Sequence, residues 1–354
     1  MISIGTRSPS HLVGLDIEPG YIAAAEVETR GKLTLTRAAS APLESGVVRD
    51  GEVTDVEALA DALRALFAAH KFPRRVRVGV VNQRVIVRTV DLPPIEDPKE
   101  LDAAIRFQAS DYIPMPLEQA VLEYQALGIH ETEQGRRMRV VLVAARRDMV
   151  MRLVSAVRMA GLRPEGVDLS AFALVRALYH ETLTPGAASM LIHVGGLTNL
   201  AVASNGTCLF ARALPGGLET MVEALAERRG LTLTHARQWL GHVGLSGPLE
   251  SVEGDPEIVS EGRRVLLDGV RVLADEVRNS LDYYRTQVEG DEVETTLLSG
   301  PAAAISGFAE QLSGELGMPV RVAAVERARA DVAVDGQLGD FTVAAGLAVE
   351  ERAA

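Results

Sequence analysis

One strand, turn, strand, strand and helix block occurs twice in this chain, and the repetition limits the folds that the chain can adopt. The matching strand segments are Leu12 to Ile17, Tyr21 to Glu28 and Lys32 to Ala41 in the first half, and Ala188 to Val194, Asn199 to Ser204 and Cys208 to Leu214 in the second. The dipeptide Asn205-Gly206 is a strong signal for a two-residue hairpin. A block of this kind occurring twice indicates internal duplication. The sequence therefore predicts two related α/β domains.

The length of the chain agrees with two domains. A chain of 354 residues is expected to form two units of roughly 150 to 180 residues. We expect the last helix, Val343 to Arg352, to return and pack on the first domain. The predicted boundaries are 1–180 plus 330–354 for domain 1, with an inserted subdomain at 92–137, and 186–329 for domain 2, with a helical subdomain at 215–290.

Composition argues against nucleic acid as a partner, against a disulfide within the chain and against a membrane-spanning segment. The chain has 36 basic and 48 acidic residues, a net charge of −12, and only 4% aromatic residues. An acidic chain with few aromatics is not expected to bind nucleic acid. Cys208 is the only cysteine, so no disulfide forms within the chain. No 18 apolar residues occur together, and we expect a soluble cytoplasmic protein that another protein brings to the membrane.

Two prolines shape the segment that follows a predicted helix from Asp97 to Ser110. Asp97 is the expected N-cap and is followed by a proline at the first helical position. Pro114 and Pro116 then prevent the helix from continuing, and we expect Tyr112 and Ile113 to be extended. From the residues alone, this is a kinked connection between a helix and a strand.

Several motifs occur in the order and spacing of a known family. They are Tyr-Ile-Pro-Met-Pro at 112–116, Val-Gly-Leu-Asp-Ile at 13–17, Val-Ala-Ala-Arg at 143–146, Ala-Gly-Leu-Arg-Pro at 160–164, Ser-Leu-Asp-Tyr-Tyr at 280–284 and Leu-Leu-Ser-Gly at 297–300. Together they resemble the type IV pilus assembly protein PilM family. The resemblance implies an α/β, actin-like fold, with two duplicated domains facing a cleft and an inserted subdomain of the FtsA/PilM type in domain 1.

The resemblance also implies where a nucleotide would bind. ATP would lie between the loops of the two domains, with Asp16 holding Mg²⁺ and small residues letting backbone N–H groups approach the phosphates. Asp168 lies roughly where related ATPases polarise the attacking water, and it reads equally well as a helix cap. The residues that match the nucleotide positions are Asp16, Gly20, Gly195, Gly196, Thr198, Gly217, Glu219, Ser299 and Gly300.

Five departures from the family pattern affect this cleft. Glu18 replaces a glycine, Pro19 a serine, Ala23 a lysine and His193 an aspartate, and Pro301 interrupts the adenosine loop. A carboxylate repels phosphates, a proline removes a donor, and phosphoryl transfer depends on positioned positive charge. We therefore expect no significant ATP hydrolysis, with binding of ATP and Mg²⁺ left open. His193 reads as structural, with an acid, base or ligand role as the alternative.

The function that the resemblance implies is a structural adaptor. Such a protein binds the cytoplasmic tail of a PilN-type inner-membrane protein and links it to motor or platform proteins of the pilus, and it is compatible with a homo-oligomer. The alternatives are an active actin-like ATPase and an FtsA-like division protein. The expected partner-binding residues are Phe107, Tyr112, Ile113 and Pro114, although Tyr112 and Ile113 can equally anchor the core of the insert.

Overall fold

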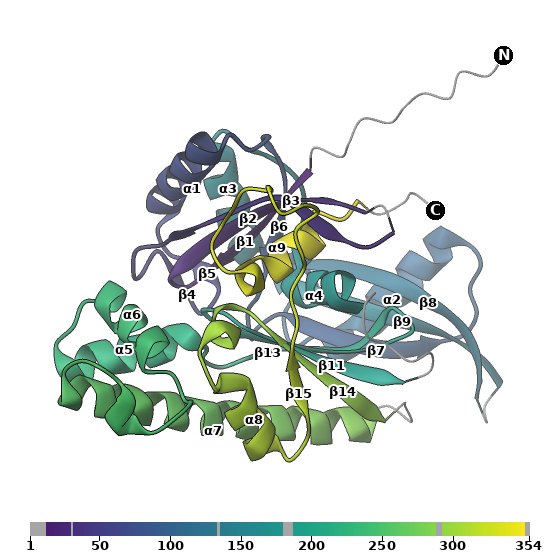
Figure 1. Cartoon of the computed structure of the whole chain (residues 1–354). Helices are drawn as coiled ribbons and strands as arrows, with labels where there is room; N and C mark the ends of the chain where they lie inside the picture. The colour runs from purple at the N-terminus through teal and green to yellow at the C-terminus, as the bar shows by residue number, and fades with distance from the viewer. Residues whose placement is uncertain (1–11, 30, 133–134, 180–186, 288–291, 351–354) are drawn as a thin grey trace.

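The computed structural model describes residues 12–29, 31–132, 135–179, 187–287 and 292–350 (Figure 1). The first sheet has the strand order β10-β6-β1-β2-β3-β16, and a small hairpin, β4-β5, lies beside it. These strands are β1 Leu12–Glu18, β2 Tyr21–Glu28, β3 Thr34–Pro42, β4 Val48–Arg49, β5 Glu52–Val53, β6 Arg75–Val80, β10 Arg163–Leu169 and β16 Val334–Asp335.

The second sheet repeats the antiparallel opening of the first. Its order is β13-β12-β11-β14-β15, so β11, β12 and β13 pair as β1, β2 and β3 do. Asn205 and Gly206 both have positive φ, as the predicted two-residue hairpin requires. The strands are β11 Ala188–Val194, β12 Thr198–Ser204, β13 Thr207–Leu214, β14 Val293–Ser299 and β15 Val320–Val322. The duplication expected from the sequence is confirmed, whereas the exact domain boundaries stay predictions.

Helices cover both faces of each sheet. On one face of the first sheet, α1 and α3 pack on a core that includes Leu15 and Val78. Between the two sheets, α4 and α9 share a core to which both contribute, for example Ala25 and Leu191. The other face of the second sheet is covered by the remaining long helices. Their bounds are α1 Val56–His70, α3 Arg147–Met159, α4 Ser170–Leu178, α5 Leu218–Arg229, α6 Leu233–Val243, α7 Pro256–Gln287, α8 Phe308–Leu316 and α9 Thr342–Leu347, with short 3-10 turns at Leu117–Gln119, Leu249–Ser251, Pro301–Ala304 and Leu338–Phe341.

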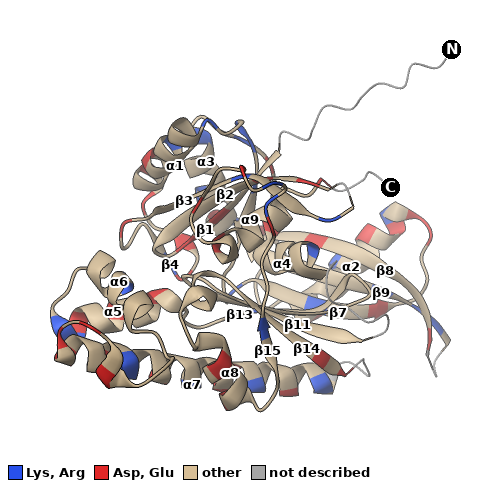
Figure 2. Ribbon diagram, viewed as in Figure 1, with Lys and Arg blue, Asp and Glu red and all other residues tan. Residues whose placement is uncertain are grey.

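The longest helix, α7, faces solvent on one side. Acidic and basic residues are interspersed along its ribbon (Figure 2). Four ion pairs on α7 join residues three positions apart: Glu261 with Arg264, Asp268 with Arg271, Asp275 with Arg278, and Asp282 with Arg285. Ion pairs at this spacing stabilise an exposed helix modestly.

A third sheet, with the order β7-β9-β8, stands beside the first two (Figure 1). It comprises β7 Ile86–Leu92, β8 Ala120–Thr132 and β9 Gly135–Arg146. One face packs on α2, Pro98–Tyr112, around Ile105 and Leu142. Asp97 is the N-cap of α2, and its side chain accepts hydrogen bonds from two backbone N–H groups of the first turn, as predicted.

The end of the chain returns to the first sheet in a shorter helix than expected. The predicted helix from Val343 to Arg352 is wrong in length, because α9 ends at Leu347 and residues 351–354 lie outside the described part. The packing on the first half is confirmed by contacts with α4 and β1. A Cβ atom added at Gly14 would lie 1.8 Å from the carbonyl oxygen of Ala344, so α9 lies almost directly on the β1 backbone.

Candidate functional site

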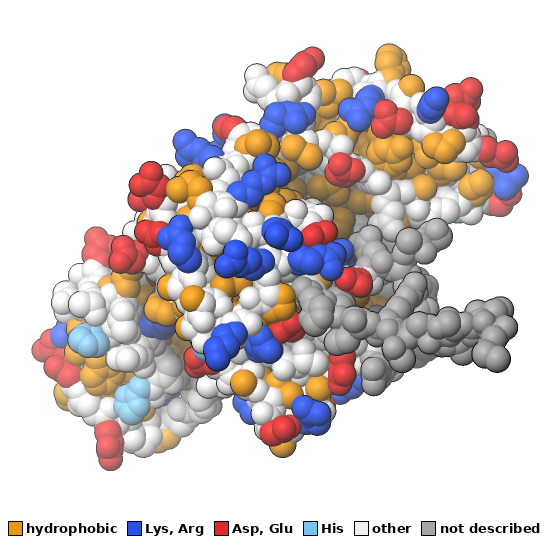
Figure 3. Space-filling view, turned by 90° about the horizontal axis from the view of Figure 1, so that it is seen from above, with side chains coloured by type: hydrophobic (Ala, Val, Ile, Leu, Met, Phe, Trp, Pro, Cys, Tyr) orange, Lys and Arg blue, Asp and Glu red, His pale blue; other side chains and the backbone are white. Residues whose placement is uncertain are grey.

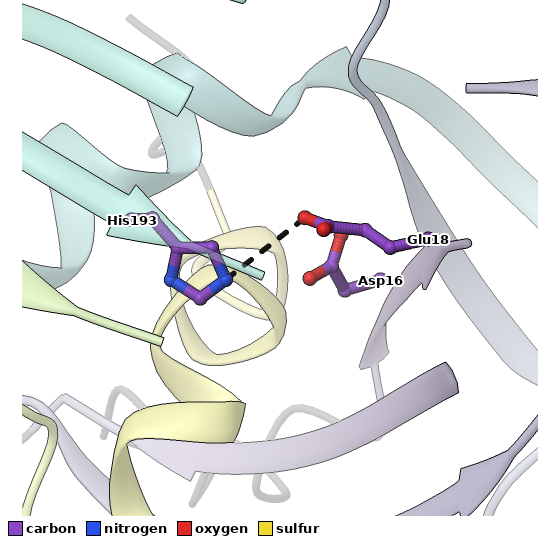
Figure 4. A group of neighbouring side chains, drawn as sticks. All are labelled: Asp16, Glu18 and His193. Atoms are coloured by element: carbon purple, nitrogen blue, oxygen red, sulfur yellow. Dashed lines mark ion pairs between the residues drawn. The ribbon is translucent and has the colours of Figure 1, made fainter. Parts of the chain in front are cut away.

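Two carboxylates and one imidazole meet where the first hairpins of the two sheets approach each other. Asp16 and Glu18 are two residues apart on β1, so their side chains leave the strand on the same face. His193 is on β11 of the second sheet. Figure 4 shows both carboxylates beside the ring of His193. All three side chains are fully buried.

Glu18 joins the two halves through a backbone donor. Its Oε2 accepts a hydrogen bond from the N–H of Leu197, at 3.0 Å, in the turn between β11 and β12. Its Oε1 lies 3.9 Å from Nε2 of His193. The Glu18 carboxylate therefore accepts the backbone N–H of Leu197, which lies in the loop that the sequence predicts to bind a phosphate.

The imidazole is held by neighbours on both of its nitrogens. Nδ1 of His193 lies 3.0 Å from Oγ of Ser299, and Nε2 lies 3.3 Å from the hydroxyl of Tyr21. Ser299 ends β14, which lies next to β11 in the second sheet, whereas Tyr21 begins β2 in the first. When Nδ1–H donates to Ser299, Nε2 carries no proton and accepts a hydrogen bond from the Tyr21 hydroxyl.

Burial governs the protonation of this group. It raises the pKa of Asp16 to about 7 and raises the pKa of Glu18 well above its ordinary value, where the nearby Asp16 charge adds to the effect. Burial lowers the pKa of His193 to about 3, so the ring is neutral near pH 7. Both oxygens of Asp16 and Oε1 of Glu18 lack a hydrogen-bond partner among the described residues. Buried carboxylates in this state are costly unless a proton or a cation compensates them.

The glycines of the second loop are required by close contacts. A Cβ at Gly195 would lie 2.3 Å from Oε2 of Glu18, and a Cβ at Gly196 would lie 2.1 Å from the carbonyl oxygen of Pro19. The two hairpins thus contact each other directly. The sequence predicts that Gly195 and Gly196 let a phosphate approach the backbone. In the structure, the side chain of Glu18 and the backbone of Pro19 lie in this space.

The remaining positions expected to bind nucleotide surround this contact. A Cβ at Gly217 or at Gly300 would lie within 2.6 Å of backbone oxygens of the second hairpin. The carboxylate of Glu219 pairs with Arg237 against Gly20. Thr198 is buried at the start of β12 and, with Gly217, borders a pocket of about 170 Å³ between α5 and α7.

Asp168 is not part of the cluster. It lies on β10, which is two strands away from β1 in the first sheet. Its Oδ1 accepts from the N–H of Leu169, and its Oδ2 pairs with Arg176. The helix-cap interpretation is wrong, because Leu169 is the N-cap of α4 and no side chain caps that helix. The two oxygens of Asp168 are instead used in contacts within the first half, one with the next residue of the chain and one with α4.

The arrangement does not fit a nucleotide phosphate. The carboxylate of Glu18 takes the N–H of Leu197, and the carbonyl of Pro19 fills the space beside Gly196. Ala23, at the position of the expected lysine, is fully buried and supplies no charge. Whether ATP is bound or hydrolysed in solution stays a prediction, as do the nucleotide-binding roles of the residues named from the sequence.

The structure separates the four residues expected to bind a partner. Phe107 and Tyr112, on α2, are 83% and 42% exposed, and Pro114 is exposed. Ile113 is buried in the core of the third sheet, which agrees with an anchoring role. The prediction that Tyr112 is extended is wrong, because α2 includes it and only Ile113 is extended. Proline restricts its immediate predecessor, so the helix can continue to the residue before that.

Sequence reasoning missed the association of Glu18 with His193. The spacing of Asp16 and Glu18 indicates one shared face of a strand, and this signal was available. The contact between Glu18 and His193 joins residues 175 positions apart and depends on how the two sheets pack.

No helix in the described part of the chain is long and apolar enough to cross a membrane.

Comparisons with solved structures agree on the fold. The chain is similar to ethanolamine utilization protein EutJ from Carboxydothermus hydrogenoformans, with 15% identity, 95% of this chain and 88% of that chain covered, and a TM-score of 0.51. It is also similar to MreB5 of Spiroplasma citri bound to ADP, with 14% identity, coverage of 95% and 94%, and a TM-score of 0.50. These likenesses establish an actin-like fold, as the sequence predicted.

A nearer likeness concerns the family. A solved structure described as "PilM-PilN type IV pilus biogenesis complex" is 26% identical, with 96% of this chain and 98% of that chain covered and a TM-score of 0.77. The family model of the type IV pilus assembly protein PilM matches residues 14–352, which is nearly the whole chain. The chain therefore belongs to the PilM family of type IV pilus assembly proteins.

Proposed function

We propose that this chain is a structural adaptor in a type IV pilus machine, where it binds the cytoplasmic tail of a PilN-type inner-membrane protein. The observation that carries the proposal is the family membership together with the 26% identical PilM–PilN complex, which covers almost the full length of both chains. In this role the chain lies on the cytoplasmic side of the membrane and is recruited there by its partner. It then links that partner to motor or platform proteins of the pilus.

The surface that we assign to the tail lies on α2. Phe107 and Tyr112 expose large apolar side chains there, and Figure 3 shows hydrophobic side chains gathered at the end of the molecule that holds α2 and β8. Exposed apolar groups that gather on one surface are typical of interaction sites. Ile113 anchors the end of the helix in the core. A supported helix end loses little conformational entropy on binding, which favours affinity.

Charge supports a tail of this origin. Cytoplasmic segments next to membrane spans carry an excess of Lys and Arg, and this chain has a net charge of −12. Asp111 is exposed beside Tyr112 and offers a carboxylate at the proposed surface. Complementary charge of this kind increases the association rate and makes binding sensitive to salt.

The buried cluster of Asp16, Glu18 and His193 favours an adaptor over an ATPase. In the described structure, Glu18 occupies the N–H of Leu197 that a phosphate would need. An interaction between the two halves that uses the chain's own residues keeps the molecule in one shape without a nucleotide. A stable shape suits a protein that holds partners at fixed positions.

Two matched tyrosine variants test the proposed surface. Tyr112 and Tyr283 are similarly exposed, at 42% and 39%, but Tyr283 lies on α7. We expect Tyr112→Ala to weaken binding of the PilN-type tail peptide by about tenfold or more, as loss of an interface aromatic does, and Tyr283→Ala to leave it unchanged. Calorimetry measures the affinity, and circular dichroism checks that both variants fold. Equal affinity of the two variants would remove Tyr112 from the site.

The link to the motor has its own test. Purified motor and platform proteins are mixed with this chain, with and without the PilN-type partner, and complexes are separated by size. We expect a complex that contains this chain together with one of them. If this chain remains separate from all of them in both conditions, the adaptor role is limited to the membrane partner.

A further inference from the structure

The buried cluster of Asp16, Glu18 and His193 has the composition of a metal site. Each residue offers one ligand atom, and these atoms all lie within 4.8 Å of one another. Both oxygens of Asp16 and Oε1 of Glu18 have no hydrogen-bond partner among the described residues, although the side chains are fully buried. Polar atoms buried in this way are rare in native proteins and require an explanation. A bound cation supplies one.

We propose that Asp16, Glu18 and His193 bind one divalent transition-metal ion of the zinc class, which joins the two halves of the molecule directly. Two carboxylates balance the charge of a divalent ion. Imidazole favours zinc-like ions over Mg²⁺, which prefers oxygen ligands. The site therefore differs in ligands and in chemistry from a magnesium ion held through nucleotide phosphates.

The surroundings of His193 are those of a metal ligand. Metal-binding histidines usually donate their second ring N–H to a neighbouring oxygen, which orients the ring. Nδ1 of His193 lies 3.0 Å from Oγ of Ser299 in this way, which leaves Nε2 to face Glu18. The Tyr21 hydroxyl, 3.3 Å from Nε2, would release this nitrogen when the ion binds.

The distances require only a small adjustment. Zinc binds nitrogen and oxygen at about 2.0–2.2 Å, so its ligand atoms lie roughly 3–4 Å apart. Nε2 of His193 and Oε1 of Glu18 are already 3.9 Å apart. Rotation of the carboxylates can bring the remaining oxygens within range. Oε2 of Glu18 keeps its hydrogen bond to Leu197, because the proposed ligand atom is the other oxygen.

The site links strands that are far apart in sequence. Asp16 and Glu18 belong to β1 and His193 to β11, so one ion would connect the first sheet with the second. A ligand that binds only the folded state raises stability according to its affinity and concentration. The ion would thus stabilise the contact between the two halves in the absence of a nucleotide.

The test uses the full chain, freed of metal by a chelator and titrated by calorimetry with Zn²⁺, Mn²⁺ or Mg²⁺. The unfolding temperature and the metal content by mass spectrometry are measured in parallel. We expect one zinc ion per chain, a higher unfolding temperature with zinc, and weaker binding of Mg²⁺. Tighter binding of Mg²⁺ than of Zn²⁺ would overturn the assignment to the zinc class. Absence of stoichiometric binding by all three ions would overturn the site.

Variants locate the binding. His193→Gln and Asp16→Asn should each weaken zinc binding by about a hundredfold or more, since loss even of an outer-shell partner costs about 10- to 100-fold. The controls are His242→Gln on the exposed face of α6, and Cys208→Ala, which removes the only thiol. Both controls should bind zinc like the wild type. If a control loses zinc, or if folded Asp16→Asn and His193→Gln retain it, the site lies elsewhere.

Discussion

Oε2 of Glu18 accepts a hydrogen bond from the backbone N–H of Leu197, 179 residues away in the sequence. The resemblance to actin-like ATPases predicts that an N–H in this turn faces a phosphate. In the described structure, this N–H donates instead to a carboxylate of the opposite hairpin. The relationship explains why glycines remain in the second loop, because Gly195 has Glu18 where a side chain of its own would lie.

The contribution of this bond can be isolated by comparing two substitutions of Glu18. Glu18→Gln keeps an acceptor for the N–H of Leu197, whereas Glu18→Ala leaves that donor buried without a partner. We expect Glu18→Ala to have a free energy of unfolding about 1–3 kcal/mol lower than Glu18→Gln. Urea unfolding in the presence of a chelator measures both values. Equal stability of the two variants would mean that the hydrogen bond does not hold the halves together.

ATP turnover is expected to stay at background. The carboxylate of Glu18 and the uncharged Ala23 oppose the positioned positive charge on which phosphoryl transfer depends. Phosphate release is measured with ATP and Mg²⁺, with and without the PilN-type tail. Turnover that is comparable to ordinary actin-like ATPases and is abolished by Asp16→Ala would contradict this prediction. Binding without hydrolysis would leave the adaptor proposal intact.

Two helical glycines should respond in opposite directions to alanine. A Cβ at Gly346 in α9 would lie 1.8 Å from the carbonyl oxygen of Ala173 in α4, whereas Gly314 in α8 is exposed with nothing within 4 Å. Gly346→Ala should lower the free energy of unfolding by about 2 kcal/mol or more, because overpacking forces the helices apart. Gly314→Ala should raise it by up to about 1 kcal/mol through helix propensity. Denaturant unfolding of both variants decides the matter, and a tolerated Gly346→Ala would show that α9 and α4 can separate freely.

Asp340 should make stability depend on pH. Burial raises its pKa from 3.8 to about 6, although the N–H of Gln337 donates to its Oδ2. Between these two values the folded protein holds a proton that the unfolded chain has lost, so stability falls as pH rises from about 4 to about 6 and then levels. The shift corresponds to at most about 3 kcal/mol.

Asp340→Asn removes this titration. The variant should therefore gain stability relative to the wild type as pH rises from 4.5 to 7.5, with urea unfolding at both values as the measurement. Since Asn keeps an acceptor for the N–H of Gln337, this hydrogen bond remains. A constant difference between variant and wild type at the two pH values would show that Asp340 does not titrate in this range.

Features of the fold that depend only on neighbouring residues were predicted well from the sequence. The cap at Asp97 and the hairpin at Asn205-Gly206 depend on neighbouring residues alone, and both are present. The helix predicted to end at Ser110 continues to Tyr112, because a proline restricts its immediate predecessor, here Ile113, and not the residue before that.

The candidate site was only partly predictable. Glu18 and His193 each depart from the family pattern, and each departure, taken alone, indicates only that a nucleotide-binding residue has been replaced. Their contact depends on the packing of two sheets, which no local pattern encodes. The sequence thus locates the altered positions, and the structure adds that the altered residues interact with each other.

The most direct test of the central claim is a calorimetric titration of the full chain with the cytoplasmic tail peptide of the PilN-type protein of the same organism. A peptide of the same composition in scrambled order is the control. We predict saturable one-to-one binding with a Kd on the order of micromolar, weakened by salt, and no binding of the scrambled peptide. Absence of saturable binding at roughly a hundred times that concentration, or equal binding of both peptides, would contradict the proposal that this chain is the adaptor for that tail.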